Sequence, residues 1–281
     1  MPSATEVKKR YGACSNWRGV LAVLKDVSLL YLALWIAAHY GHYWFIALAM
    51  IWLIGMLQFA MGESLLHEAS HDHLFKSKVL NNAVGNVIGY AIFTTLDTWK
   101  KEHQIHHKYL LSDQDHLYWD YQRYRLHQGL HPFILWVLRP LGGVVGWQWI
   151  QSELPSLFKH LPVFISYSVI TLCCYVTHHL DSLLLYWFLP LIWVYPSILY
   201  WSEITDHYLA RSTTRSNLSP IWNGMFHSGG YHWLHHQYPF VPWYLLQDAH
   251  QVLTPTNTDQ VKSWWGMYQV LLSDYQTHKV L

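Results

Sequence analysis

The sequence predicts an all-α integral membrane protein, with four transmembrane helices in two hairpins and a cytosolic helical cap that carries clusters of histidines. Three observations support this fold class. Hydrophobic residues make up 52% of the 281 residues and charged residues only 12%, about half the charged fraction of a typical soluble domain. The sequence contains four long apolar runs, arranged as two closely spaced pairs. The 17 tryptophans and 20 tyrosines are typical of chains whose aromatic side chains line membrane interfaces.

The first predicted hairpin covers residues 26–66, after a polar cytosolic tail at residues 1–25. Its two apolar runs are Val27–Tyr40 and Tyr43–Leu66. With its flanking residues, each run is about long enough at 1.5 Å per residue to cross a ~30 Å hydrocarbon core. The break between the runs is short and uncharged, which favours a tight turn on the non-cytosolic side.

The second predicted hairpin covers residues 161–201. Leu161–Thr177 and Leu183–Trp201 are again strongly apolar, and a turn at residues 178–182 joins them. Two hairpins give four crossings, so both termini are expected on one side of the membrane. This order of apolar and polar segments predicts one membrane domain over residues 1–281.

The segments outside the hairpins are expected to lie in the cytosol or at the membrane surface. Residues 67–160 are predicted to form cytosolic and interfacial helices, with Leu130–Ile150 as an interfacial, re-entrant or kinked segment. Residues 202–281 are predicted to form a cytosolic C-terminal region, which includes a short helix over Val261–Ser273.

The positions of the positive charges predict the orientation in the membrane. Every lysine and arginine lies outside the two hairpin turns at residues 40–43 and 178–182. Lysine and arginine accumulate on the cytosolic side of membrane proteins, so both termini and the histidine clusters are expected to face the cytosol. The formal net charge is only +1, which gives no electrostatic argument for nucleic-acid binding.

Eight histidines form three clusters at helical spacing. Residues three and four apart share one face of a helix, so each cluster directs its imidazole rings toward one point. Neutral imidazole is the commonest metal ligand in proteins. Eight such ligands exceed the four that a tetrahedral zinc ion takes, which predicts two metal ions in a shared site. The clusters are His67 and His71; His103, His106 and His107; and His232, His235 and His236.

The three clusters, in this order, resemble the histidine motifs of the integral-membrane fatty acid desaturase and hydroxylase family. Residues 74–81, after the first cluster, and residues 235–244, around the end of the third, are similar to its bacterial members. The resemblance extends over roughly residues 60–250. It implies an enzyme with two non-haem iron ions that uses O2 to desaturate the acyl chain of a fatty acid or lipid from the bilayer.

His207 and Glu203 are candidate site residues outside the clusters. The resemblance implies an additional histidine ligand at the end of the last transmembrane helix, and His207 has that position. Glu203 precedes it by one helical turn. Its carboxylate is expected either to hold His207 or a metal-bound water, or to be a solvated side chain at the helix end. The other histidines are expected to be structural.

Three other functions remain open from the sequence. Hydroxylases and ketolases of lipids or carotenoids have the same histidine pattern, so the clusters alone do not distinguish them from desaturases. His67, Glu68 and His71 also match the His-Glu-x-x-His motif of zinc metalloproteases, although a protease would leave six clustered histidines without a role. A non-catalytic metal-binding membrane protein would leave the convergence of the clusters unexplained.

No electron-transfer module is recognisable in the sequence. It contains no Cys-x-x-Cys and no Gly-x-Gly-x-x-Gly motif, and its three cysteines do not predict a disulfide framework. Electrons are therefore expected from an external donor such as a ferredoxin. A basic surface at Lys100, Lys101, Lys108 and Arg123 is the expected docking site, although contact with anionic lipids explains these charges equally well.

Overall fold

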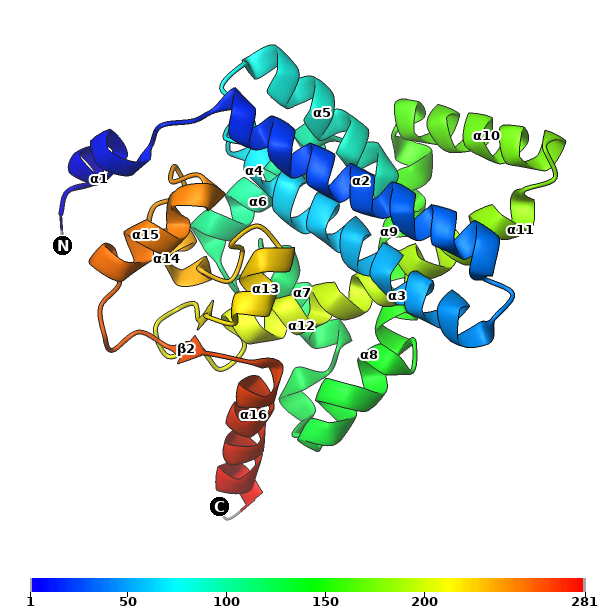
Figure 1. Cartoon of the computed structure of the whole chain (residues 1–281). Helices are drawn as coiled ribbons and strands as arrows, with labels where there is room; N and C mark the ends of the chain where they lie inside the picture. The colour runs from blue at the N-terminus through cyan, green and yellow to red at the C-terminus, as the bar shows by residue number, and fades with distance from the viewer. Residues whose placement is uncertain (1, 280–281) are drawn as a thin grey trace.

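The computed structural model describes residues 2–279, and helices account for nearly all the regular structure in this range (Figure 1). The first residue of the predicted tail and the last two of the predicted C-terminal region lie outside the described residues. Two short strands, β1 (Ser216–Asn217) and β2 (Gln260–Val261), pair in parallel. The predicted all-helical class is therefore confirmed.

The first hairpin consists of α2 (Asn16–Tyr40) and a second helix that is continuous from Trp44 to Ser70. α2 begins before the predicted boundary because the side chain of Ser15 accepts a hydrogen bond from the backbone N–H of Arg18 and caps the helix. The two helices pack side by side (Figure 1). The second helix comprises α3 (Trp44–Phe59), the π-helix η1 (Ala60–Leu65) and α4 (Leu66–Ser70).

A third long helix runs without interruption from Leu180 to His207 and packs against α3. Among the described residues, this helix and the two helices of the first hairpin are each long and apolar enough to cross a membrane. The segments of the third helix are α11 (Leu180–Leu183), the π-helices η4 (Leu184–Phe188) and η5 (Pro190–Val194), and α12 (Tyr195–His207).

The remaining predicted crossing is shorter than expected. α10 (Leu161–Val176) has 16 residues, which span about 24 Å at 1.5 Å per residue, less than a ~30 Å hydrocarbon core. It is long enough only together with α9 (Val144–Lys159), from which it is bent by 99°. α5 (Lys78–Ala91) and α6 (Leu96–Tyr109) form a second bent pair, at 88°. The described residues thus provide three to five candidate crossings, and the four-helix topology stays a prediction.

The long helices bury one face and expose the other. Ala33 and Ile54 are fully buried between helices, whereas Leu24, Leu32 and Trp44 are exposed. Large exposed apolar surfaces are rare on soluble monomers and are expected where helices face lipid. The apolar residues on the outer faces of these helices are therefore consistent with contact with lipid.

The other elements form the cap and its connections to the long helices. The predicted C-terminal helix begins at Trp264 rather than Val261, because Val261 pairs with Asn217 in the small sheet. These elements are α1 (Ala4–Tyr11), α7 (His116–Arg123), the 3-10 helix η2 (Leu126–Gln128), the π-helix η3 (Ile134–Leu138), α8 (Arg139–Leu141), α13 (Pro220–Met225), α14 (His232–Gln237), α15 (Trp243–Leu253) and α16 (Trp264–Lys279).

Candidate metal centre

The predicted histidines come from four helices that are far apart in the sequence. α4 carries His67 and is followed directly by His71, and α12 ends at His207. The second cluster lies on α6 and the third on α14. α4 packs against α6, and the ring contacts between histidines of all four elements place their ends in one region of the cap.

The nine predicted histidines form two groups. Within each group, one ring nitrogen per residue lies within 4.8 Å of every other such nitrogen. The first group contains five histidines and the second contains four, so each group draws on more than one cluster. The five-histidine group is His67, His71, His103, His107 and His235, and the four-histidine group is His106, His207, His232 and His236.

The Nε2 atoms of the five-histidine group point at one another. Nε2 of His235 lies 2.9 Å from Nε2 of both His67 and His107, and Nε2 of His103 lies 3.0 Å from that of His71. A neutral imidazole carries one N–H donor, so hydrogen bonds between the rings cannot satisfy five converging nitrogens. Two nitrogens bound to one ion at about 2.1 Å are at most about 4.2 Å apart. These separations fit a shared metal ion.

The four-histidine group also fits a metal ion. Nε2 of His207 lies 2.9 Å from Nε2 of His232, and Nε2 of His236 is buried without a hydrogen-bond partner. A buried polar atom without a partner is costly, and a metal ion would satisfy it. Burial, with a further contribution from the neighbouring histidines, lowers the pKa of His232 and His236 well below the usual range. The rings are therefore neutral, as metal ligation requires.

The profile that describes the fatty acid desaturase family matches residues 42–268, which is most of the chain. The chain belongs to the fatty acid desaturase family. The omega-3 fatty acid desaturase of the endoplasmic reticulum from Nicotiana tabacum is 31% identical to it over 97 residues. That match covers 32% of this chain and 24% of the relative, so the chain spans about a quarter of the relative's length. That relative is a desaturase of the endoplasmic reticulum, and the described residues of this chain include three helices long and apolar enough to cross a membrane.

Glu203 lies one turn before His207 on α12. No hydrogen bond joins the two side chains, and Nδ1 of His207 is buried without a partner. The carboxylate of Glu203 instead lies beside His116 and Asp120, with one ligating atom from each within 4.8 Å of the others. Its Oε2 atom is buried and also without a partner. The alternative role for Glu203 in this desaturase family member, holding a metal-bound water, stays a prediction.

Three buried carboxylates lie behind the histidine groups, one for each sequence cluster, and helical spacing alone predicts none of them. Each approaches Nδ1 of a histidine, and such a contact orients the ring and leaves Nε2 to bind a metal ion. Glu68 and Asp206 are each the sequence neighbour of a predicted ligand, which is a weak signal. The pairs are Glu68 with His67 (3.6 Å), Asp115 with His106 (3.2 Å) and Asp206 with His232 (3.9 Å).

The position of Glu68 argues against the metalloprotease alternative. A protease of this type uses the glutamate as a general base, which must reach a water on the metal ion. Here Oε2 of Glu68 accepts a hydrogen bond from the backbone N–H of Trp243 at the start of α15, and Oε1 faces Nδ1 of His67. The carboxylate therefore joins α4 to α15 and supports a histidine, as expected for a structural role in this family member.

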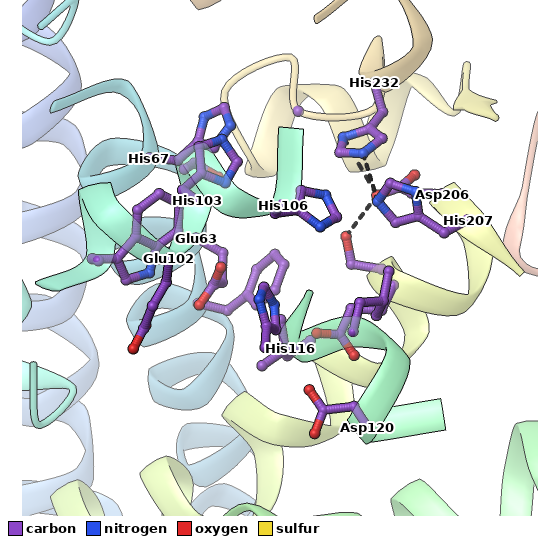
Figure 2. A pocket seen from close by; sticks show the side chains of 18 of the residues that line it. Glu63, His67, Glu102, His103, His106, His116, Asp120, Asp206, His207 and His232 are labelled. Atoms are coloured by element: carbon purple, nitrogen blue, oxygen red, sulfur yellow. Dashed lines mark hydrogen bonds and ion pairs between the residues drawn. The ribbon is translucent and has the colours of Figure 1, made fainter. Parts of the chain in front are cut away.

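A cavity of about 390 Å³ adjoins both histidine groups. His67, His103, His106, His207 and His232 are among its lining residues, and Figure 2 shows their rings along one side of it. The long helices and α9 supply much of the remaining wall. Its volume is within the ~300–1,000 Å³ range of ligand pockets. The cavity is therefore the candidate substrate site.

Proposed function

We propose that this chain is an O2-dependent desaturase that holds two iron ions through nine histidines and acts on the acyl chain of a fatty acid or lipid. The observation that carries the proposal is the convergence of these nine histidines in two groups beside one cavity. When bound, two redox-active ions supply O2 activation and the removal of hydrogen from an unactivated C–H bond, which side chains alone cannot achieve. One saturated C–C bond, O2, two electrons and two protons give one double bond and two waters.

In this proposal, the residues of the chain bind the metal ions, orient the ligand rings and position the substrate. The neutral rings of the two groups hold the ions, and Glu68, Asp115 and Asp206 orient three of the rings from behind. The cavity reaches Phe59 and Leu199 on two of the membrane-spanning candidate helices. A substrate can therefore enter from the bilayer and place a carbon beside the metal ions. The positions of the lysines and arginines support an orientation with the cap and both termini in the cytosol.

An external electron donor is part of the proposal, but the predicted basic docking surface is weaker than the sequence suggests. Lys100 forms an ion pair with Asp72 at 2.8 Å, and Lys101 forms one with Asp97 at 2.7 Å. Such pairs reduce the net positive field of the surface. A ferredoxin-like donor would therefore depend more on shape and on Lys108 than on a broad basic patch.

Metal analysis and product analysis test the proposal together. We expect about two iron ions per purified chain, and an O2- and reductant-dependent loss of two hydrogens from a membrane lipid when the chain is expressed. A hydroxylated or keto product with the same iron content would favour the hydroxylase or ketolase alternative. A chain that binds one zinc ion and no iron would contradict the proposal.

A further inference from the structure

The cavity beside the histidines has an unusual composition for a site that holds an apolar chain. Seven carboxylate side chains line it, against one arginine and no lysine. The arginine, Arg123, already pairs with Asp120 at 3.3 Å. Figure 2 shows Glu63, Glu102 and Asp120 around the same space as the labelled histidines. The seven are Glu63, Glu68, Glu102, Asp120, Glu153, Glu203 and Asp206.

The proposed metal ions account for only some of these carboxylates. Glu68 and Asp206 lie behind ligand rings, where they offset the charge of the ions. Among the described residues, Glu63 and Glu153 form no hydrogen bond or ion pair with any of the nine histidines. Asp206 is only 5% exposed, yet its Oδ1 atom has no hydrogen-bond partner. The cavity therefore retains acceptor capacity that the protein itself does not satisfy.

Aromatic rings form a continuous wall next to two of these carboxylates. Trp149 packs edge-on against Tyr195 at 5.4 Å between ring centroids, and Tyr195 lies 6.2 Å from Phe59. Glu63 is one turn beyond Phe59 and accepts a hydrogen bond of 2.5 Å from the hydroxyl of Tyr195. Glu153 is one turn beyond Trp149 on α9. All five side chains line the cavity.

Aromatic ring faces and carboxylates both bind cations. Ring faces attract cations, and aromatic cages are a recurrent way to bind ammonium groups. Glu63 and Glu153 are half-buried, and carboxylates removed from water in this way are stabilised by a paired cation but gain no hydrogen bond from an apolar chain. A plain hydrocarbon chain would satisfy the aromatic wall but would leave Glu63 and Glu153 without a charged partner.

We propose that the acyl lipid desaturated in the reaction proposed above carries a positively charged nitrogen, as an amine or ammonium group. The nitrogen binds between the aromatic wall of Phe59, Trp149 and Tyr195 and the carboxylates of Glu63 and Glu153. This places the charged end of the substrate in the cavity and an adjacent carbon of its chain beside the histidine groups. The inference rests on the proposed function for the reaction, but the binding site itself depends only on the cavity.

Three probes with the same chain and different head groups test this proposal. Dodecylamine, dodecanol and dodecanoate are titrated by calorimetry into the purified protein in a non-ionic detergent, without O2 or reductant. We expect the dissociation constant for dodecylamine to be lower than that for dodecanol by about tenfold or more, because removal of a charged partner from a buried pair has effects of this size. Equal or tighter binding of dodecanol or dodecanoate would overturn the proposal.

Two variants locate the preference within the cavity. Glu63→Gln and Glu153→Gln keep the size of the side chain and remove its charge, so each should reduce the preference for dodecylamine over dodecanol. Glu6→Gln in α1 is the matched control, because Glu6 pairs with Ser3 at the exposed N-terminal helix and should leave the preference unchanged. An unchanged preference in both cavity variants would contradict this site. Iron content and desaturation are measured separately, so failure of the catalytic proposal is distinguishable from failure of this one.

Discussion

Each carboxylate oxygen of Asp115 lies 3.2 Å from Nδ1 of His106, so the ring of His106 is held from behind. Asp115 is 0% exposed. It also accepts hydrogen bonds from the backbone N–H groups of Leu111 and Leu117. One carboxylate thus fixes the end of α6, the start of α7 and the orientation of a proposed ligand. Asp115 therefore connects the cap of a helix to the candidate metal site.

Replacement of Asp115 is predicted to weaken the binding of metal. Asp115→Asn keeps the shape of the side chain but removes the charge that favours an N–H at Nδ1 of His106. Loss of a carboxylate behind a ligating histidine typically lowers metal affinity about 10–100-fold, which is measured as iron loss to a chelator at increasing concentration. Asp113→Asn, two residues earlier at an exposed position, is the control. Equal iron retention in Asp115→Asn and Asp113→Asn would show that Asp115 only caps α7.

His207 is predicted to be a ligand equal in importance to the clustered histidines. Its Nε2 atom lies 2.9 Å from that of His232, so His207→Ala removes one of four nitrogens that converge. We expect His207→Ala to lose iron and activity to the same extent as His235→Ala, and more than Glu203→Ala. His39→Ala should retain both, because His39 bonds to the carbonyl of Trp35 in α2. Normal iron content in His207→Ala would remove it from the site.

Much of the candidate metal centre can be predicted from the sequence, because the spacing of histidines within each cluster is a local property of the chain. Helical spacing brings the histidines of each cluster onto one face of a helix. Three faces of this kind can bind shared metal ions only if they point at one another. The three supporting carboxylates are different, since the contact between Asp115 and His106 depends on how α7 folds back onto α6. The widened π-helical turn of η1, which ends two residues before His67, has no clear sequence signal either. The short length of α10 could not be predicted either, because apolar composition does not indicate the 99° bend between α9 and α10.

Gly146 is predicted to be required for the packing of α9 against the third long helix. A Cβ atom at Gly146 would lie 2.0 Å from the backbone oxygen of Ile192, and a backbone atom cannot move aside cheaply. Gly146→Ala should therefore lower the free energy of unfolding by about 1–3 kcal/mol or more, measured as a lower thermal midpoint in detergent. Gly224→Ala is the matched control, since a Cβ there would meet nothing within 4 Å. Equal midpoints for the two variants would show that α9 adjusts its position.

The orientation in the membrane is predicted from the positive charges and is tested with reporter fusions. Fusions at residue 1, near residue 120 and at residue 281 should all report the cytosol, because every lysine and arginine is outside the hairpin turns. A fusion in the 178–182 turn should report the opposite side. Because α10 alone spans only about 24 Å, this turn is the sharpest test of the topology. A cytosolic signal there would mean that the α9–α10 pair re-enters the membrane without crossing it.

A buried pair on the far side of the site is predicted to hold the third cluster in place. Oδ2 of Asp26 in α2 lies 2.7 Å from Nε2 of His227, and the two residues are 0% and 8% exposed. His227 and Ser228 adopt positive φ angles of 47° and 59°, which non-glycine residues rarely adopt. The loop that leads into His232 therefore depends on a partner that keeps it in this conformation.

Asp26→Ala removes that partner and leaves a buried imidazole nitrogen without a hydrogen bond. A buried donor left without its acceptor costs about 1–3 kcal/mol, so the thermal midpoint should fall. The iron content should fall with it, because the shifted loop displaces His232 from the four-histidine group. Asp26→Asn keeps one acceptor for His227 and should have an intermediate effect, while Asp181→Asn at an exposed position in α11 should have none. Wild-type stability and iron content in Asp26→Ala would mean that other hydrogen bonds fix the loop conformation, such as those from Ser64 to the carbonyl of Phe226 and from the N–H of Ser228 to the carbonyl of Asn223.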